Sequence, residues 1–292
     1  MSDAVAQRVR ELAASASVEV TPRDARRLAE VEPLPPGTSV YITALPGHDT
    51  AELVQAAVAI RAAGHSPVPH IAARGISDEA ALDRLLGNLV AEAGVDDVLV
   101  VAGSVKQQAG SLSFSLDVLR SGLLERHGIA RVGVAGHPEG SPDFSDESAV
   151  ESLLEKNALA RELPFRMRVV TQFALDAAPY LAWERRVREA GNTLPVIAGV
   201  PGVTSPATLI KYGLACGVGP SLDRLRKQSG GLLRLATTRL WTPDELVAQI
   251  AAATLEDRDS LFRGVHFFPF GGIDRTADWL AAQRDTETAL RA

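Results

Sequence analysis

Short apolar runs alternate with longer amphipathic stretches along almost the whole chain. The runs have the length of β-strands and are bounded by glycine, proline or polar residues, whereas the stretches between them repeat their apolar positions with helical spacing. The predicted strands are 17–20, 39–44, 66–71, 97–101, 131–135, 168–171, 194–198 and 265–269. The predicted helices are 50–63, 78–93, 116–127, 148–161, 179–190, 205–216, 223–227, 242–253 and 276–284.

Residues at the ends of the predicted helices support this assignment. Thr50 and Thr242 stand where N-caps are expected, just before the apolar face of a helix begins. Glycine, which tolerates the left-handed conformation that ends many helices, follows four of the helices just before the next strand. These glycines are Gly64, Gly94, Gly128 and Gly191.

Strict alternation of strand and helix predicts a parallel sheet with right-handed crossovers. Eight strands in 292 residues favour a closed (β/α)₈ TIM barrel. A doubly wound open sheet is the alternative, but it would place a glycine-rich turn after the first strand, and residues 18–22 contain no glycine. Without internal repeats or interdomain linkers, residues 1–292 are predicted to form a single domain that begins with an amphipathic helix over about residues 1–16.

Composition narrows the class of protein. The chain is 46% hydrophobic and 23% charged, has a net charge of −6, and contains no basic block, which argues against nucleic acid as its main partner. No apolar run reaches the roughly 18 residues of a membrane helix. The lone Cys216 cannot form an internal disulfide, and charged residues interrupt the N-terminal segment where a leader peptide would be apolar, so a cytoplasmic protein is expected. The six histidines are scattered, so no metal site is predicted.

Candidate functional residues stand where the predicted strands end, because ligands of α/β barrels bind at the carboxyl ends of the strands. The apolar run before Gln172 ends abruptly in this amide, which needs a hydrogen-bonding partner if it is buried. Other strands offer Glu19, Thr43, His70, Ser104 and His137 at or near their ends.

Glu19 alternates with Val18 and Val20, so its side chain points to the opposite side of the strand, into the barrel or its mouth. An apolar setting would raise the pKa of this carboxyl and make it a general acid near neutral pH. The alternative is a glutamate of the barrel floor paired with an arginine. His70 is either a ligand contact or a structural histidine, and His137, in a Gly/Pro loop, is expected to be exposed. These residues predict a barrel enzyme with a polar mouth but do not name its reaction.

Several segments, taken in order, resemble the methylenetetrahydrofolate reductase family. They are Val-Glu-Val-Thr-Pro at 18–22, Pro-His-Ile-Ala-Ala-Arg at 69–74, Val-Val-Ala-Gly-Ser at 100–104, Ala-Gly-His-Pro-Glu-Gly at 135–140, Leu-Leu-Glu-Lys at 153–156, Val-Thr-Gln-Phe at 170–173 and His-Phe-Phe-Pro-Phe-Gly-Gly at 266–272. Each is short, but their order and their places at successive strand ends make the set specific. The resemblance spans roughly residues 17–280.

The resemblance implies a TIM barrel that binds FAD at the carboxyl ends of its strands. NADH or NADPH would reduce the flavin, which would pass hydride to 5,10-methylene-tetrahydrofolate and yield 5-methyl-tetrahydrofolate. Glu19 matches the general acid, and Gln172, followed by Phe173, matches the folate-binding position. The cofactor-binding positions are Thr43, His70, Ala102, Gly103, Ser104, His137 and Lys156. Members of this family often associate, so a homo-oligomer is also compatible with the resemblance.

The sequence departs from the family on the flavin side. Ala102-Gly-Ser104 stands where the family has Arg-Gly-Asp, and His137-Pro-Glu139 replaces Tyr-Pro-Glu, whereas Glu19 and Gln172 are kept. Two alternatives therefore stay open: direct hydride transfer from NADH without a flavin, and a non-catalytic folate-binding barrel. An unrelated aldolase or lyase is disfavoured because no lysine lies in a predicted strand.

Overall fold

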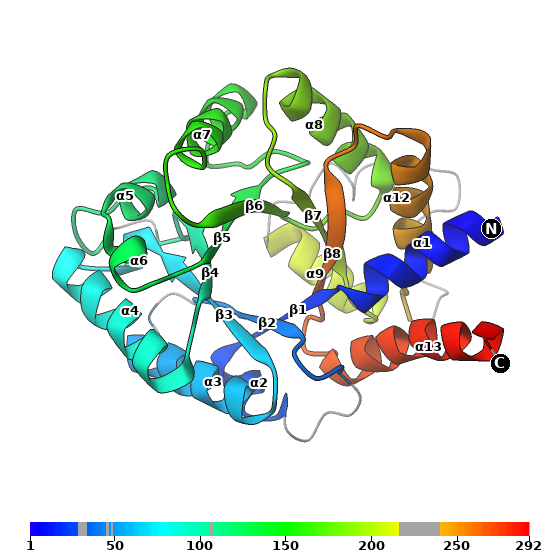
Figure 1. Ribbon diagram of the computed structural model, residues 1–292, viewed down its shortest axis with the longest axis horizontal. Helices are drawn as coiled ribbons and strands as arrows, with labels where there is room; N and C mark the ends of the chain where they lie inside the picture. The colour runs from blue at the N-terminus through cyan, green and yellow to red at the C-terminus, as the bar shows by residue number, and fades with distance from the viewer. Residues whose placement is uncertain (29–33, 45–46, 48, 106–107, 216–239, 292) are drawn as a thin grey trace.

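The computed structural model describes residues 1–28, 34–44, 47, 49–105, 108–215 and 240–291, and its centre is a closed barrel of eight parallel strands (Figure 1). Each strand pairs with its neighbours in chain order, and β1 closes the barrel against β8. The strands are β1 (Ser17–Val20), β2 (Ser39–Ile42), β3 (Ser66–Ala72), β4 (Asp97–Val101), β5 (Arg131–Gly136), β6 (Arg166–Thr171), β7 (Val196–Pro201) and β8 (Phe262–Phe268).

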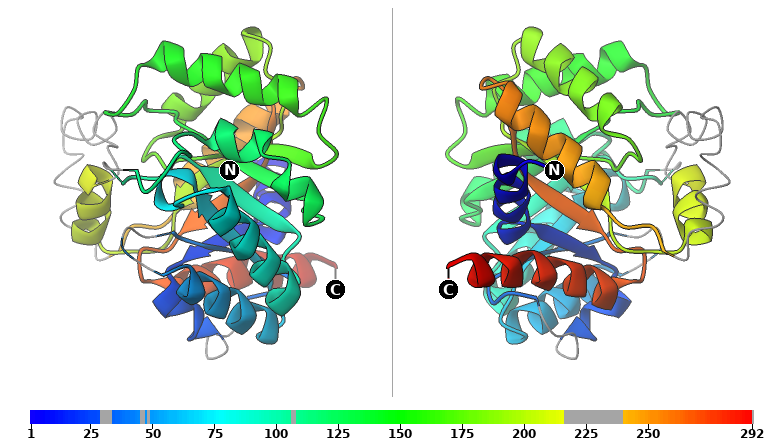
Figure 2. Two further views of the ribbon diagram at one scale, coloured as in Figure 1. Left: turned by 90° about the vertical axis from the view of Figure 1, so that its left-hand side faces the viewer. Right: turned by 90° about the vertical axis from the view of Figure 1, so that its right-hand side faces the viewer.

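Helices surround the barrel (Figures 1 and 2). They are α1 (Asp3–Ala14), α2 (Pro22–Ala25), α3 (Thr50–Ala62), α4 (Glu79–Ala93), α5 (Ser115–Arg120), α6 (Leu123–Arg126), α7 (Asp146–Leu159), α8 (Ala177–Glu189), α9 (Pro206–Ala215), α12 (Asp244–Glu256) and α13 (Ile273–Arg291), with a 3₁₀ turn η2 (Ala73–Gly75) after β3. Helix α1 packs against α12 and α13, and the two termini lie on the same side of the molecule (Figure 1). None of the described helices is long and apolar enough to span a bilayer.

The prediction of a single (β/α)₈ barrel is confirmed, with corrections at particular elements. The predicted helix 116–127 is divided into α5 and α6 at Gly122, whose φ of +72° ends one helix before the next begins. The N-cap of α3 is Asp49 rather than Thr50, because the Asp49 carboxylate accepts a hydrogen bond from the Ala51 amide at 3.1 Å. Pro243 rather than Thr242 precedes α12. The predicted helix 223–227 and Cys216 lie outside the described residues.

Because side chains alternate along each strand, one set faces the surrounding helices and the other faces the inside of the barrel. Val18, Val20, Val40 and Ile42 belong to the main hydrophobic core between the strands and the helices. The residues between them point into the barrel, where Tyr41, Val68, Leu99 and Val170 form a smaller apolar cluster. The register pairs Glu19 with Tyr41, so the carboxylate stands beside the inner core rather than among the outer valines.

A buried charged network lies inside the barrel next to this inner cluster. The Arg168 guanidinium donates hydrogen bonds to the Tyr41 hydroxyl at 2.6 Å and to the Asp97 carboxylate at 2.9 Å. Arg131 donates to the other carboxylate oxygen of Asp97 at 3.1 Å. The arginine-paired carboxylate of the barrel interior is thus Asp97, at the start of β4, and not Glu19.

Candidate functional site

Glu19 lies between two imidazoles. Its Oε2 atom is 3.3 Å from His70 Nε2 and 3.7 Å from His266 Nε2. The three side chains come from β1, β3 and β8, which the closed barrel makes neighbours or near neighbours. Neither Nε2 atom has a hydrogen-bonding partner elsewhere in the described part of the chain. The two imidazole Nε2 atoms therefore face the same carboxylate oxygen, Oε2 of Glu19.

The prediction of a raised pKa at Glu19 is wrong, and the two histidines are the reason. Burial alone would raise the pKa of the carboxyl, but the interactions with His266 and His70 outweigh burial and lower it to about 2. The surroundings of the Glu19 carboxylate are thus polar rather than apolar, because two imidazole nitrogens face it. Glu19 is ionised at neutral pH, and the alternative of a pair with an arginine is also excluded for the described residues.

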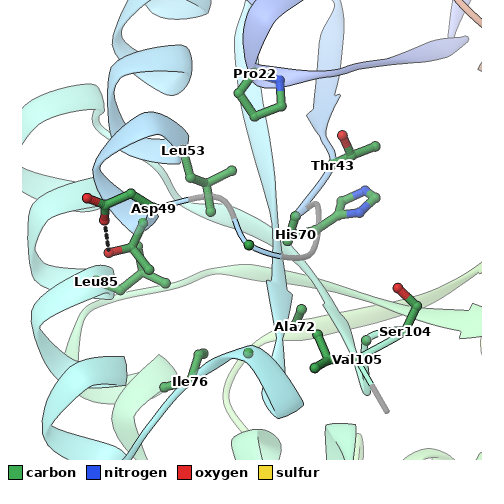
Figure 3. A pocket seen from close by; sticks show the side chains of 15 residues that line it. Pro22, Thr43, Asp49, Leu53, His70, Ala72, Ile76, Leu85, Ser104 and Val105 are labelled. Atoms are coloured by element: carbon green, nitrogen blue, oxygen red, sulfur yellow. Dashed lines mark hydrogen bonds between the residues drawn. The ribbon is translucent and has the colours of Figure 1, made fainter. Parts of the chain in front are cut away.

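A cavity of about 100 Å³ opens beside His70 (Figure 3). Four of the predicted cofactor residues line it, namely Thr43, His70, Gly103 and Ser104. Apolar side chains of α3 and α4, Leu53 and Leu85, form another part of its wall. The structure therefore gathers the ends of β2, β3 and β4 around one space, as their order in the barrel requires.

The end of β4 approaches the neighbouring strand closely. Gly103 has a φ of +88°, and a Cβ atom there would stand 3.1 Å from the Ala72 Cβ, so glycine suits this turn. The Ala102 carbonyl accepts a hydrogen bond from the Arg74 amide at 2.9 Å, which fixes the loop to β3. This fixation leaves the Ser104 hydroxyl exposed at the cavity.

His137 and Lys156, two further predicted cofactor residues, lie apart from this cavity, at the end of β5 and on α7. His137 is half-buried rather than exposed, because its ring packs edge-on against Phe144 at 4.8 Å. Burial, followed by the Lys156 charge, lowers the pKa of His137 to about 4. Burial also lowers the pKa of Lys156 to about 8, and its ammonium donates to the Ser152 hydroxyl at 3.0 Å. Lys156 remains protonated at neutral pH and is a buried cation at this end of the barrel.

Gln172 directly follows β6, and its backbone amide donates to the Gly136 carbonyl at 2.8 Å. Phe173 is only 2% exposed and belongs to an aromatic cluster with Phe268 and Phe270. The cluster reaches α9 through Tyr212, whose ring stacks on Phe270 at 4.5 Å. The cluster also extends toward Glu19 through Phe268, whose ring packs edge-on against the His266 ring at a centroid distance of 4.8 Å. The aromatic cluster thus joins the β6 end to the Glu19 side of the barrel.

Tyr180 of α8 holds the loop that carries Gln172. Its buried hydroxyl donates to the Gly199 carbonyl and accepts a hydrogen bond from the Ala174 amide. Gly199 allows the strands to approach, because a Cβ atom there would lie 2.1 Å from the Thr171 carbonyl oxygen. The amide of Gln172 is therefore presented from a segment that is fixed on both sides.

Removing this hydroxyl is expected to weaken the fold. Tyr180→Phe would leave the Ala174 amide and the Gly199 carbonyl buried without their partner, at a cost of about 2 kcal/mol in the free energy of unfolding. Urea denaturation measures the change. Tyr212→Phe is the matched control, because it removes the same atom from a partly exposed ring. Equal stabilities of the two variants would contradict the role given to Tyr180.

Several residues of this site were not among the sequence candidates. His266, Tyr41 and Arg168 are polar or amphipathic side chains at inward positions of apolar strands, and alternation within each strand carries that signal. Phe270 is the one described non-glycine residue with a positive φ, at +50°, which marks a constrained turn after β8. The sequence alone does not indicate that Tyr212 reaches this turn.

Comparison with solved structures finds matches at very low identity. DHPS from Yersinia pestis, solved with a pterine–sulfa conjugate, is 12% identical over 94% of this chain and 93% of that one, with a TM-score of 0.44. Dihydropteroate synthase from Thermus thermophilus is 14% identical over 92% of each chain, with a TM-score of 0.41. A mandelate racemase/muconate lactonizing enzyme from Bordetella bronchiseptica is 13% identical over 91% of this chain and 56% of that one, with a TM-score of 0.41. Values this low indicate nothing about what the present chain binds.

A family model gives a specific assignment. The model of methylenetetrahydrofolate reductase matches residues 20–219, which is more than half of the 292 residues. The match begins one residue after Glu19 and includes His70, Ser104, Lys156 and Gln172. The chain therefore belongs to the methylenetetrahydrofolate reductase family.

Proposed function

We propose that this protein is an oxidoreductase of folate metabolism that interconverts 5,10-methylene-tetrahydrofolate and 5-methyl-tetrahydrofolate with NADH or NADPH. The observation that carries the proposal is Glu19, a carboxylate enclosed by two imidazoles within a barrel of this family. The Glu19 side chain keeps 16% of its surface exposed, so a ligand at the strand ends can reach it. Such a carboxylate suits a reaction in which a cation develops on the substrate.

The chain's own residues supply binding, charge and proton transfer. Opening the five-membered ring of the methylene compound leaves a positively charged iminium, which the ionised Glu19 would stabilise. The nitrogen that leaves the methylene carbon must also gain a proton. Because the pKa of Glu19 is about 2, that proton has to reach Glu19 from a neighbouring group.

Gln172 is proposed to hold the pterin ring. A primary amide donates and accepts hydrogen bonds at once, as the edge of a pterin requires. The aromatic rings beside it, Phe173, Phe268 and Phe270, provide an apolar wall against which a flat ring can pack.

Gln172→Ala should weaken folate binding about ten- to hundred-fold, because one or two hydrogen bonds worth about 1–3 kcal/mol are lost. Calorimetry with 5-methyl-tetrahydrofolate in the absence of nicotinamide measures the dissociation constant without turnover. Gln249→Ala, on the exposed side of α12 where its amide contacts Glu245, is the matched control. Unchanged affinity of the Gln172 variant would exclude this residue from the pterin site.

FAD is proposed as the hydride carrier, and the described residues fit it in the chemistry of their donors. Hydroxyl and imidazole groups of Thr43, Ser104 and His70 line the cavity and suit the polar edge of a flavin ring. The buried ammonium of Lys156 suits a diphosphate. When bound, FAD would take hydride from the nicotinamide and deliver it to the folate.

Direct transfer from NADH is a second candidate, and one feature of the cavity supports it, namely the lack of a free acidic side chain among the described lining residues. Among the residues described there, Asp49 is the one acidic side chain, and it already caps α3. The Ser104 hydroxyl carries no charge with which to adjust a flavin's redox potential.

The absorption spectrum of the purified protein distinguishes the two routes, and activity tests the function itself. The proposed function predicts NADH or NADPH oxidation that depends on methylene-tetrahydrofolate. A flavin band in the active protein supports the FAD route, and an active colourless protein that gains nothing from added FAD supports direct transfer. Folate binding without nicotinamide oxidation at any tested pH would overturn the proposed function in favour of a binding protein.

A further inference from the structure

The two imidazoles on either side of Glu19 differ in their surroundings. His266 is fully buried, and its Nδ1 atom lies 2.9 Å from the Ser17 hydroxyl. The Tyr41 ring packs on the His266 ring at 4.4 Å. The His70 side chain is instead 12% exposed and lines the cavity at the strand ends. Of the two histidines that face Glu19, therefore, His70 is the one in contact with a space open to ligand.

The protonation state of His266 follows from its burial. Burial is the largest influence on His266 and lowers its pKa, so its ring is neutral. Because the Glu19 carboxylate faces Nε2, the neutral ring is favoured with its hydrogen on Nε2, and the Ser17 hydroxyl then donates to Nδ1. This N–H then points toward the carboxylate oxygen 3.7 Å away, where its dipole favours the ionised carboxylate and its position.

The remaining titratable groups around Glu19 cannot supply a proton. Tyr41, on β2, has a pKa raised by burial, and its hydroxyl already accepts hydrogen bonds from Arg168 of β6. Arg168 remains protonated and is bound to Asp97 of β4. Among the described residues that face the carboxylate from β2, β3, β6 and β8, His70 is left as the group that can carry an exchangeable proton.

We propose that His70 is the proton donor to Glu19, so that the two residues together form the acid of the site, while His266 is a positioning residue. This inference rests on the proposed function. It changes the role of His70 from a contact for the cofactor to a participant in proton transfer, and it accounts for a reaction that needs an acid where the nearest carboxyl is ionised.

Atoms and electrons balance in this transfer. A proton moves from His70 Nε2 to Glu19 Oε2, and from the carboxyl to the substrate nitrogen N10. The bond between N10 and the methylene carbon breaks with its electron pair remaining on N10, and the N5 lone pair forms the N5=CH₂ iminium. The reduced nicotinamide is the source of the hydride that converts this carbon to a methyl group, and the nicotinamide is oxidised. His70 recovers a proton from water in the cavity.

Chemical rescue tests the role of His70 in turnover. His70→Ala should lower kcat at least about 100-fold, as expected for loss of an acid catalyst, while the dissociation constant of 5-methyl-tetrahydrofolate changes only a few-fold. The missing ring leaves a space continuous with the cavity of about 100 Å³, so added imidazole should restore kcat at least ten-fold. Among substituted imidazoles, the restored rate should vary with the pKa of the additive.

Two control variants show whether the response to imidazole is specific to the loss of the His70 ring. Glu19→Gln should not respond to imidazole, because the group that contacts the substrate is itself missing. His127→Ala, which removes a histidine paired with Asp83 away from the site, should keep wild-type kcat with or without imidazole. Wild-type kcat in folded His70→Ala, or a low kcat that no imidazole changes, would overturn the proposal.

A measurement without substrate keeps the inference separate from the proposed function. In protein labelled with ¹⁵N-histidine at pH 7, the His70 nitrogen shifts should be those of an imidazolium in the wild type and should move toward the neutral ring in Glu19→Gln. A His70 ring that is neutral in both proteins would refute the proton donor even if the reductase is active. Imidazolium shifts in a protein without reductase activity would leave the proton pair standing and overturn the proposed function instead.

Discussion

Glu19→Gln is expected to lower kcat of the reductase reaction by about three orders of magnitude while the fold stays intact. The amide has the size of the carboxylate, but it can neither pass a proton to the substrate nor balance the charge of the iminium, and acid–base catalysis alone contributes about 10²–10⁴-fold. Steady-state oxidation of NADH or NADPH with methylene-tetrahydrofolate measures the effect. Folate affinity should change much less than kcat, because Gln172 is proposed to provide the main contact to the pterin.

The pH dependence of stability provides an independent check on this variant. The pKa of Glu19 is lowered in the folded protein, from 4.5 to about 2, so its ionisation stabilises the wild type above pH 4.5 and this contribution is lost as the pH falls toward 2. Glu19→Gln should lack that component, so the stability difference between the two proteins should change across this interval. Glu155→Gln, which alters an exposed pair with Arg120, is the control for both measurements. A Glu19 variant with wild-type kcat would refute the proposed mechanism.

The barrel could be predicted from the sequence because each strand is a short apolar run and each crossover is a separate helical pattern. Among the strands, only the boundaries differ from the prediction. Strand β8 begins at Phe262 rather than 265, and β7 continues to Pro201 because the two strands pair along this length, with Val200 opposite Phe267. Pairing of this kind depends on a partner far away in the chain, which local periodicity does not contain.

The position of Glu19 was predictable, but its protonation state was not. Alternation with two valines placed the carboxylate on the inner side of β1, and the structure agrees. The charge depends on His266, which is adjacent only because β8 closes the barrel against β1, with Ser17 opposite His266. A predicted barrel makes its first and last strands neighbours, so a polar residue at an inward position of the last strand is the signal that would have found this contact.

The buried charged network inside the barrel was likewise only partly predictable from the sequence. Tyr41, Asp97 and Arg168 come from β2, β4 and β6, and the inner side chains of alternate strands meet in the interior of such barrels. Polar residues at inward positions identify them as candidates. Which arginine binds which carboxylate depends on strand tilt and side-chain length, and neither is visible in one sequence.

Arg168→Met is expected to lower the free energy of unfolding by about 3 kcal/mol, because it breaks a buried pair and leaves a charge behind. The side chains of Arg168 and Asp97 are 17% and 6% exposed, so the carboxylate would lose a charged partner where water reaches it poorly. Burial already raises the pKa of Asp97 in spite of two arginines, so the variant should raise it further. The Tyr41 hydroxyl would also lose its donor, and Tyr41 packs on His266, so a smaller loss of kcat should accompany the loss of stability.

Arg131→Met is the matched control, because this arginine binds the other oxygen of Asp97 but is 40% exposed. It should cost about 1 kcal/mol or less, as exposed ion pairs do. The double variant Arg168→Met with Asp97→Leu should recover part of the loss, since no buried charge is then left without its partner. Urea unfolding of the wild type, Arg168→Met, Asp97→Leu and the double variant gives the coupling energy between Arg168 and Asp97. Equal losses for Arg168→Met and Arg131→Met would mean that burial does not strengthen this pair, and the charged network would then be incidental to the stability of the barrel.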